Sequence, residues 1–134
     1  TKRPRRCGWF DAVATKYAAE LNGFDSVALT KLDVLDALEE IKVCVGYEID
    51  GKRIETFPAV SSDLLKLKPV YESLLGWKSD TVGVTEFKKL PDNARMYVEF
   101  LSAQIGVEIG LISTGPERDQ TIILNDSVME SWFA

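Results

Sequence analysis

The sequence contains no histidine, and this absence removes several kinds of chemistry from the chain. Histidine is the side chain whose unperturbed pKa lies nearest neutrality. Without it, the chain alone cannot run a Ser-His-Asp or Cys-His mechanism, and it cannot build a histidine-containing zinc site. Any general acid–base chemistry would therefore fall to Asp, Glu, Lys, Tyr or Cys side chains.

Cysteine and long apolar runs are also scarce. The two cysteines, Cys7 and Cys44, form no CxxC motif, and we expect two buried, reduced thiols in a cytosolic protein. No apolar run approaches the ~18 residues of a transmembrane helix. The basic N-terminus is not followed by the apolar segment of a signal peptide. The sequence therefore predicts a cytoplasmic protein with no membrane partner.

Net positive charge is absent as well. Sixteen Lys and Arg residues against 21 Asp and Glu residues give a formal charge of −5, whereas nucleic-acid-binding domains are usually basic. We therefore expect no nucleic-acid partner. Apolar residues make up 46% of the 134 positions and charged residues 28%, a composition that favours one packed domain, or part of one, over disorder.

The hydrophobic pattern predicts a mixed α/β fold with parallel strands, flanking helices and an antiparallel hairpin. Helical periodicity indicates helices over 10–21 and 91–105, the second with a core face of Ala94, Tyr97, Val98, Leu101 and Ile105. The expected strands cover 26–32, 41–49, 52–56, 70–74, 107–113 and 121–124. Asp50-Gly51 is a typical hairpin turn. The remaining segments read as a short helix or turn over 34–39, a short helix over 63–67, a loop over 75–84 and a tail over 125–134.

The first candidate site is Thr30-Lys31-Leu32-Asp33, at the expected end of a parallel strand. Ligands of open α/β sheets bind beyond the carboxyl ends of strands. A carboxylate there can accept hydrogen bonds from the ring N–H and the exocyclic amine of guanine, a donor pair that adenine lacks. The Lys31 stem can lie along the base plane. The alternative is a solvated pair of charges at a strand end.

The second candidate is Ser113-Thr114-Gly115-Pro116, which follows the other expected parallel strand. Backbone N–H groups around a glycine can approach a ligand closely. Two such loops could hold one base between them, although an ordinary turn is the simpler interpretation. The three tryptophans, Trp9, Trp77 and Trp132, are expected to pack in the fold rather than to stack on bases.

The third candidate is the arginine cluster of Arg3, Arg5 and Arg6, stiffened by Pro4. Guanidinium groups bind carboxylates and phosphates with two hydrogen bonds at once. If the segment is extended, Arg3 and Arg5 point to the same side. The alternative is a solvated basic arm or the remnant of a tag.

Together these motifs resemble the C-terminal part of adenylosuccinate synthetase, and the resemblance runs to about Leu124. The matching segments, in order, are Arg3-Pro4-Arg5-Arg6-Cys7-Gly8-Trp9-Phe10-Asp11, Leu29-Thr30-Lys31-Leu32-Asp33-Val34-Leu35-Asp36, Gly51-Lys52-Arg53, Tyr71-Glu72, Gly76-Trp77, Leu90-Pro91, Ala94, Gly106-Val107 and Ser113-Thr114-Gly115-Pro116-Glu117-Arg118.

The resemblance implies a ligase of AMP biosynthesis and the C-terminal part of a P-loop-NTPase-like fold. The family joins IMP and L-aspartate into adenylosuccinate through a 6-phosphoryl-IMP intermediate, with GTP as co-substrate, GDP and phosphate released, and Mg²⁺ as cofactor. The full enzyme is usually a cytoplasmic homodimer. The family's phosphate loop, Mg²⁺ ligands and catalytic Asp and His belong to the upstream part, and this sequence contains no G-x-x-x-x-G-K-[ST] motif. The resemblance therefore implies no catalytic residue and no metal ligand here, and no synthetase activity for this chain alone.

The resemblance also implies roles for individual residues. Residues 1–8 would form the loop that closes on L-aspartate, with Arg3 also reaching IMP and Arg5 also reaching GTP. Residues 9–124 would form the guanine-binding part, with Asp33 as the selective acceptor. The implied aspartate-binding residues are Thr1, Lys2, Arg3, Pro4 and Arg5; the implied GTP-binding residues are Arg5, Lys31, Leu32, Asp33, Ser113, Thr114 and Gly115.

Two features depart from the family pattern. The family usually has glycine where Lys2 stands, and a lysine would crowd the aspartate site; the tail over 125–134 has no family role. Two other functions stay open at this point. A GTPase-like domain would explain the T-K-x-D motif but would need a phosphate loop, and a stand-alone interaction module would explain only the acidic surface.

Overall fold

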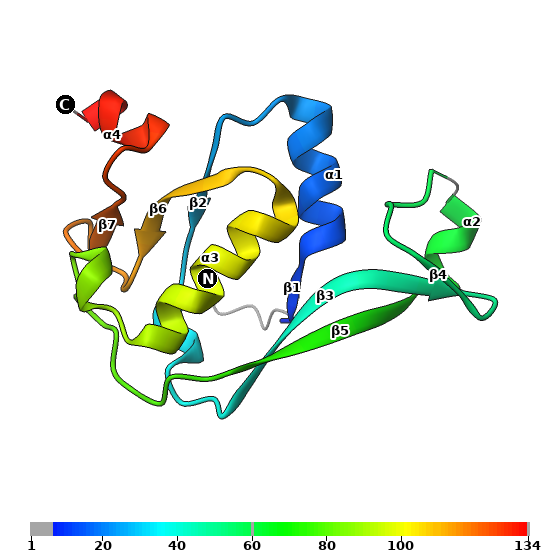
Figure 1. Ribbon diagram of the computed structural model, residues 1–134, viewed down its shortest axis with the longest axis horizontal. Helices are drawn as coiled ribbons and strands as arrows, with labels where there is room; N and C mark the ends of the chain where they lie inside the picture. The colour runs from blue at the N-terminus through cyan, green and yellow to red at the C-terminus, as the bar shows by residue number, and fades with distance from the viewer. Residues whose placement is uncertain (1–6, 60, 134) are drawn as a thin grey trace, which may run out of the picture.

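The computed structural model describes residues 7–59 and 61–133 and places them in two β-sheets with helices packed between and beside them (Figure 1). Residues 1–6 of the predicted aspartate loop 1–8, which include the arginine cluster of Arg3, Arg5 and Arg6, lie outside the described residues. None of the described helices is long and apolar enough to cross a membrane.

The first sheet is built around the long strand β3 (Glu40–Ile49). One edge of β3 pairs in parallel with β1 (Phe10–Asp11) and antiparallel with β4 (Lys52–Ile54). The other edge pairs antiparallel with β5 (Lys68–Leu75). The predicted hairpin is confirmed, and its turn residues Asp50 and Gly51 have φ angles of 49° and 78°, the left-handed values of a type I′ turn.

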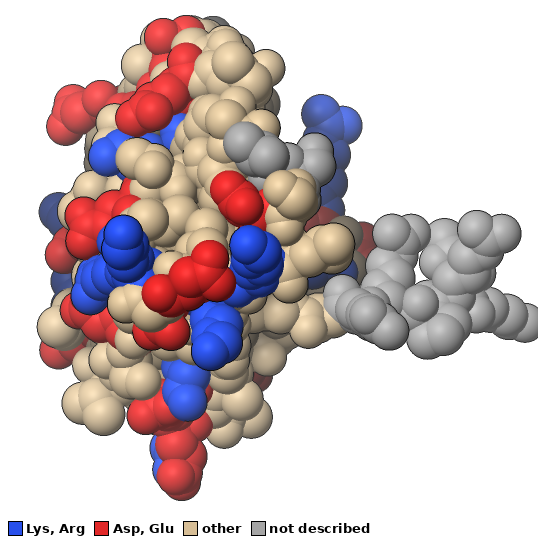
Figure 2. All heavy atoms as spheres, turned by 90° about the vertical axis from the view of Figure 1, so that its right-hand side faces the viewer, with Lys and Arg blue, Asp and Glu red and all other residues tan. Residues whose placement is uncertain are grey.

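β3 and β5 form an arm that extends away from the helices, with α2 (Ser61–Leu64) and β4 near its far end (Figure 1). Viewed from this side, basic and acidic side chains are interleaved over the surface (Figure 2). Exposed charges on an edge strand hinder pairing with other chains. Four exposed ion pairs lie on the arm: Lys42–Glu40, Arg53–Glu55, Lys66–Asp50 and Lys68–Glu48.

The second sheet contains the two predicted parallel strands side by side. β2 (Ser26–Leu29) runs parallel to β6 (Glu108–Ser113), and β7 (Thr121–Ile123) returns antiparallel to β6. The first of these strands ends at Leu29, three residues earlier than predicted, because the next residues turn into the 3₁₀ helix η1 (Leu32–Leu35). Leu32 still enters the core, but from this turn rather than from a strand.

Helices α1 (Ala12–Asn22) and α3 (Asp92–Ile105) pack against each other and supply much of the core. Asp11 caps α1 by accepting from the Ala14 N–H at 3.0 Å. Gly106 ends α3 with φ 72°, as a helix-ending glycine does. The predicted core face of α3 is confirmed: its buried residues are Ala94, Tyr97, Val98, Leu101 and Ile105.

Further local predictions were wrong. The second half of the tail forms the helix α4 (Val128–Phe133). The short helix expected at 63–67 lies at Ser61–Leu64. Cys44 is buried, as predicted, but Cys7 is exposed. Trp77 packs in the core, whereas the side chain of Trp132 is 62% exposed.

Candidate functional site

The two predicted loops leave the second sheet next to each other. Leu29 on β2 lies opposite Ile112 on β6 in a parallel register, so Thr30, the first residue after β2, and Ser113, the last residue of β6, lie at two neighbouring strand ends. The carboxyl ends of parallel strands are where α/β sheets bind ligands. The fold therefore brings Lys31, Leu32 and Asp33 to the same edge as 113–115.

The first loop is held in a special backbone conformation. Lys31 has φ 62° and ψ 41°, a left-handed conformation that costs a non-glycine residue about 1–3 kcal/mol and persists only where its surroundings enforce it. Leu32, only 1% exposed, anchors the turn in the core. Lys31 is exposed and Asp33 half-buried. Within residues 7–59 and 61–133, neither their ammonium nor their carboxylate group has a hydrogen bond or an ion pair, so both are available to a ligand.

The second loop is shaped by its own hydrogen bonds. The Ser113 hydroxyl donates to the Gly115 carbonyl at 2.9 Å. A Cβ atom on Gly115 would lie 2.1 Å from Oε1 of Gln120, so no larger residue fits there without moving that side chain. Thr114 is fully buried, and its hydroxyl donates to the Val84 carbonyl at 2.9 Å. Its side chain is therefore part of the scaffold, and the surface of this loop is left to Ser113 and Gly115.

A pocket of about 260 Å³ lies beside the first loop. Residues 7–10, which include the last two residues of the predicted aspartate loop 1–8, line it together with residues 29–32. Tyr97 also lines this pocket, and burial raises the pKa of its phenol to about 12, so the hydroxyl keeps its proton at neutral pH. The start of the described chain and the Lys31 loop thus border one cavity.

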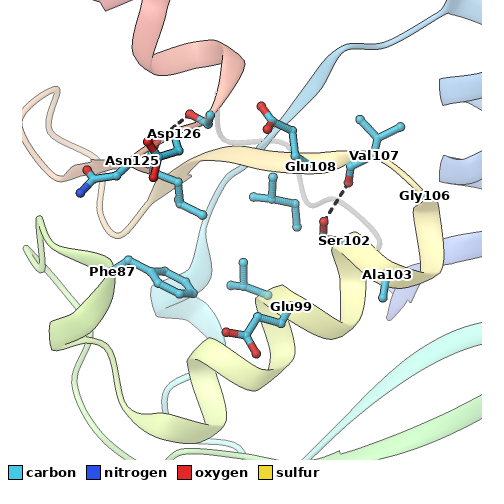
Figure 3. Close-up of a pocket in the computed structure, with 13 residues that line it drawn as sticks. Phe87, Glu99, Ser102, Ala103, Gly106, Val107, Glu108, Asn125 and Asp126 are labelled. Carbon is cyan, nitrogen blue, oxygen red and sulfur yellow. Dashed lines mark hydrogen bonds between the residues drawn. The ribbon is translucent and has the colours of Figure 1, made fainter.

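A pocket of about 610 Å³ lies at the opposite end of β6, where α3, β6 and residues 124–127 meet (Figure 3). Apolar side chains such as Phe87 and Val98 line it, together with the carboxylates Glu99, Glu108 and Asp126. Three acidic side chains repel phosphate groups. This pocket therefore lacks the charge that a nucleotide site requires.

The residue that joins this site to its surroundings was missed by the sequence analysis. Asp36, three positions after Asp33, accepts from the Trp77 indole N–H at 2.6 Å. It also accepts from the Thr81 backbone N–H at 2.7 Å and from the Thr81 hydroxyl at 2.8 Å. The matching motif contained Asp36, but its partners lie 41 and 45 positions away and carry no sequence signal of their own.

The described side chains do not provide a metal centre. Among residues 7–59 and 61–133, no group of three or more Asp, Glu, Cys or His side chains is placed to hold a metal ion. Mg²⁺ in nucleotide-dependent enzymes is usually held by one or two carboxylates together with waters and substrate phosphates, so it does not require such a cluster. The Mg²⁺ cofactor that the resemblance implies therefore stays a prediction.

Comparison with known proteins gives one consistent result. The family model for adenylosuccinate synthetase matches residues 1–122. The adenylosuccinate synthetase of Prochlorococcus marinus strain MIT 9211 is 52% identical over 128 residues, which cover 96% of this chain and 29% of that protein. That of Aquifex aeolicus is 52% identical over 126 residues, with coverage of 94% and 29%.

A solved structure agrees with the sequence relatives. The fully ligated adenylosuccinate synthetase from Plasmodium falciparum matches this fold with a TM-score of 0.87 and 38% sequence identity, over 92% of this chain and 30% of that one. The mixed α/β fold expected from the sequence is therefore confirmed. The chain spans less than a third of the length of these relatives.

Proposed function

Because the chain belongs to the adenylosuccinate synthetase family, we propose that it forms the guanine- and aspartate-binding part of a GTP-dependent ligase. The whole protein would join IMP and L-aspartate into adenylosuccinate and release GDP and phosphate. It would do so in the cytoplasm, as a homodimer, with Mg²⁺ bound by residues outside this chain.

One observation carries the proposal for the base. The parallel register that sets Leu29 opposite Ile112 supports a single binding edge formed by two loops. On one side, Asp33 would accept from the ring N–H and the exocyclic amine of guanine, while the stem of Lys31 lies along the base and Leu32 anchors the loop. On the other side, Ser113, Thr114 and Gly115 would cover the base. Adenine would leave the Asp33 carboxylate without a donor, which is unfavourable in a half-buried site.

The remaining roles rest on the family. In residues 1–8, Thr1, Lys2, Arg3, Pro4 and Arg5 would bind L-aspartate, with Arg3 also on IMP and Arg5 also on GTP. Two guanidinium groups suit the two carboxylates of aspartate and the phosphates of the nucleotide. Residues 9–124 would hold the base, and the tail over 125–134 has no assigned role.

We expect the 134-residue chain to show no synthetase activity by itself. It contains no histidine and no phosphate-binding loop, so neither a catalytic imidazole nor a phosphate cradle is available. Incubation with IMP, L-aspartate, GTP and Mg²⁺ should produce no adenylosuccinate above the rate without protein, as followed by chromatography. Turnover proportional to protein concentration would contradict the proposal that the catalytic residues and the phosphate-binding loop lie outside this chain.

The base preference can be measured directly on this chain. Titration of the ¹⁵N-labelled protein with GDP should shift the amide signals of residues 30–34 and 113–116, and ADP at the same concentration should shift them much less. Asp33→Ala should reduce GDP binding about tenfold or more and bring it to the level of ADP, because both hydrogen bonds to the guanine edge are lost.

A matched control is Asp25→Ala, which removes an exposed carboxylate just before β2, at the far end of the same strand. This variant should keep the full preference for GDP. Equal binding of GDP and ADP by the unmodified chain would overturn the proposed function, and an unchanged preference in Asp33→Ala would remove that residue from the selective role.

A further inference from the structure

Two polar side chains are fully buried in the described part of the chain, and both lie in loops. Thr81 and Thr114 are each 0% exposed. A buried hydroxyl without a hydrogen-bond partner destabilises the fold, so the partners of these two hydroxyls identify contacts that the folded chain maintains. The Thr81 hydroxyl donates to Asp36, and the Thr114 hydroxyl donates to the carbonyl of Val84. Both hydrogen bonds therefore involve the loop of residues 77–84, because Thr81 and Val84 both belong to it.

Residues 77–84, here named the bridge loop, connect the two strand-end loops of the site. At one side, Thr81 bonds through its N–H and its hydroxyl to Asp36, whose own N–H donates to the Asp33 carbonyl at 3.2 Å. Within the loop, the Val84 N–H donates to the Thr81 carbonyl at 3.1 Å. At the other side, Val84 accepts from Thr114, the residue between Ser113 and Gly115.

These contacts form one continuous chain of hydrogen bonds between the two halves of the site. It begins at the backbone of Asp33, passes through Asp36, Thr81 and Val84, and ends at Thr114. The paired strands β2 and β6 hold the two halves side by side. The hydrogen bonds through the bridge loop add a second connection, between the loops that lie at the ends of these strands. The Gly83 N–H, which faces the Thr114 carbonyl at 3.4 Å, adds a second contact at the same end.

We propose that the bridge loop sets the guanine selectivity of this site, with Thr81 and Asp36 as positioning residues. The inference rests on the proposed function. Two simultaneous hydrogen bonds from guanine demand that the Asp33 carboxylate be held within a narrow range of distance and angle. The bridge loop holds the segment that carries Asp33 at a fixed position relative to 113–115. Loosening the tie lets the carboxylate drift, and guanine then loses more than adenine because only guanine uses both bonds.

A purely structural role makes a different prediction. If the bridge loop only stabilises the fold, breaking it lowers the unfolding temperature but leaves the ratio of GDP to ADP affinity unchanged in the folded protein. The decisive quantity is therefore this affinity ratio, measured by the same ¹⁵N titration well below the unfolding temperature, with the unfolding temperature recorded separately.

The test variant is Thr81→Val, which keeps the shape of the side chain and the backbone N–H to Asp36 but removes the hydroxyl donor. We expect GDP affinity to fall about five- to tenfold, ADP affinity to change less than about twofold, and the ratio to fall accordingly. Thr81→Ser, which restores the hydroxyl, should recover most of the ratio. The matched control is Thr85→Val, an exposed threonine just after the bridge loop, which should keep the ratio of the unmodified chain.

Each outcome decides a separate point. If the unmodified chain prefers GDP and Thr81→Val keeps the same ratio, the bridge loop does not set selectivity and the inference is overturned while the proposed function stands. If the unmodified chain shows no preference, the proposed function fails, and the inference with it. Should Thr81→Val lose its dispersed amide spectrum, Asp36→Asn replaces it; a folded Asp36→Asn protein with an unchanged ratio overturns the inference equally.

Discussion

Replacing Gly76 with alanine is expected to destabilise the protein by about 3–5 kcal/mol, an unusually large effect for the addition of one methyl group. Gly76 lies where the chain after β5 crosses the chain before β3. A Cβ atom built on it would lie 1.9 Å from the Leu38 carbonyl oxygen and 2.8 Å from the Leu38 carbonyl carbon. Both are backbone atoms, so relief requires two main-chain segments to separate.

The crossing is also tied by hydrogen bonds that such a movement would break. The Gly76 N–H donates to the Glu39 carbonyl at 2.9 Å, and the Gly76 carbonyl accepts from the Asn93 side chain at 2.8 Å. The φ angle of Gly76 is not in the left-handed region, so alanine has no conformational penalty there and the steric clash alone sets the cost.

Urea unfolding followed by circular dichroism measures this difference. Gly8→Ala is the matched control, because Gly8 also lacks a left-handed φ and a Cβ atom there would meet nothing within 4 Å. We expect that variant to differ from the unmodified chain by less than about 0.5 kcal/mol. Equal unfolding midpoints for Gly76→Ala and Gly8→Ala would show that the crossing tolerates a side chain.

Helix α3 could be predicted from the sequence because the residues that indicate it lie within the helix and at its two ends. An apolar residue at every third or fourth position marks the buried face, Pro91 stands at its start and Gly106 at its end. The parallel strands β2 and β6 were predictable for a similar reason: each is a short apolar run bounded by polar or glycine residues. Because these two strands are parallel, their carboxyl ends meet at one edge of the sheet, and the candidate site lies at this edge.

Two other features show why the rest was harder. The end of β2 depends on the left-handed conformation of Lys31, and lysine, unlike glycine, asparagine or aspartate, gives no sign of that conformation in a sequence. Helix α4 did have a local signal, since Ser127 and Glu130 form an S-x-x-E sequence in which the Glu130 N–H donates to the Ser127 hydroxyl. The helix itself has only six residues, which is too short for a helical period of apolar residues to show in the sequence.

The bridge loop was beyond sequence reasoning for a physical reason. Residues 77–84 have neither helical nor strand periodicity, so they were correctly expected to form a loop, but a loop's contacts are decided by what the fold places beside it. Trp77 was expected to pack, and it does, at 7% exposure. Its second role, donating to Asp36, became visible only when two segments 41 residues apart were placed together.

Removal of the Asp36 carboxylate should have the second large effect on stability. Asp36→Ala leaves the Trp77 indole N–H, the Thr81 N–H and the Thr81 hydroxyl without their acceptor. A buried donor without a partner costs about 1–3 kcal/mol, and water entering the space left by the side chain would offset part of the sum. We therefore expect Asp36→Ala to lower the free energy of unfolding by about 3–5 kcal/mol.

Asp36→Asn separates the hydrogen bonds from the negative charge. Its amide oxygen still accepts from one side, whereas its NH₂ group faces a donor on the other, so we expect an intermediate loss of about 1–2 kcal/mol in urea unfolding. Asp25→Ala, at an exposed carboxylate, should stay within about 0.5 kcal/mol of the unmodified chain. An Asp36→Asn protein as unstable as Asp36→Ala would show that the charge, rather than the arrangement of acceptors, holds Trp77 and Thr81. An Asp36→Ala protein as stable as Asp25→Ala would mean that the three bonds add nothing to the stability of the fold.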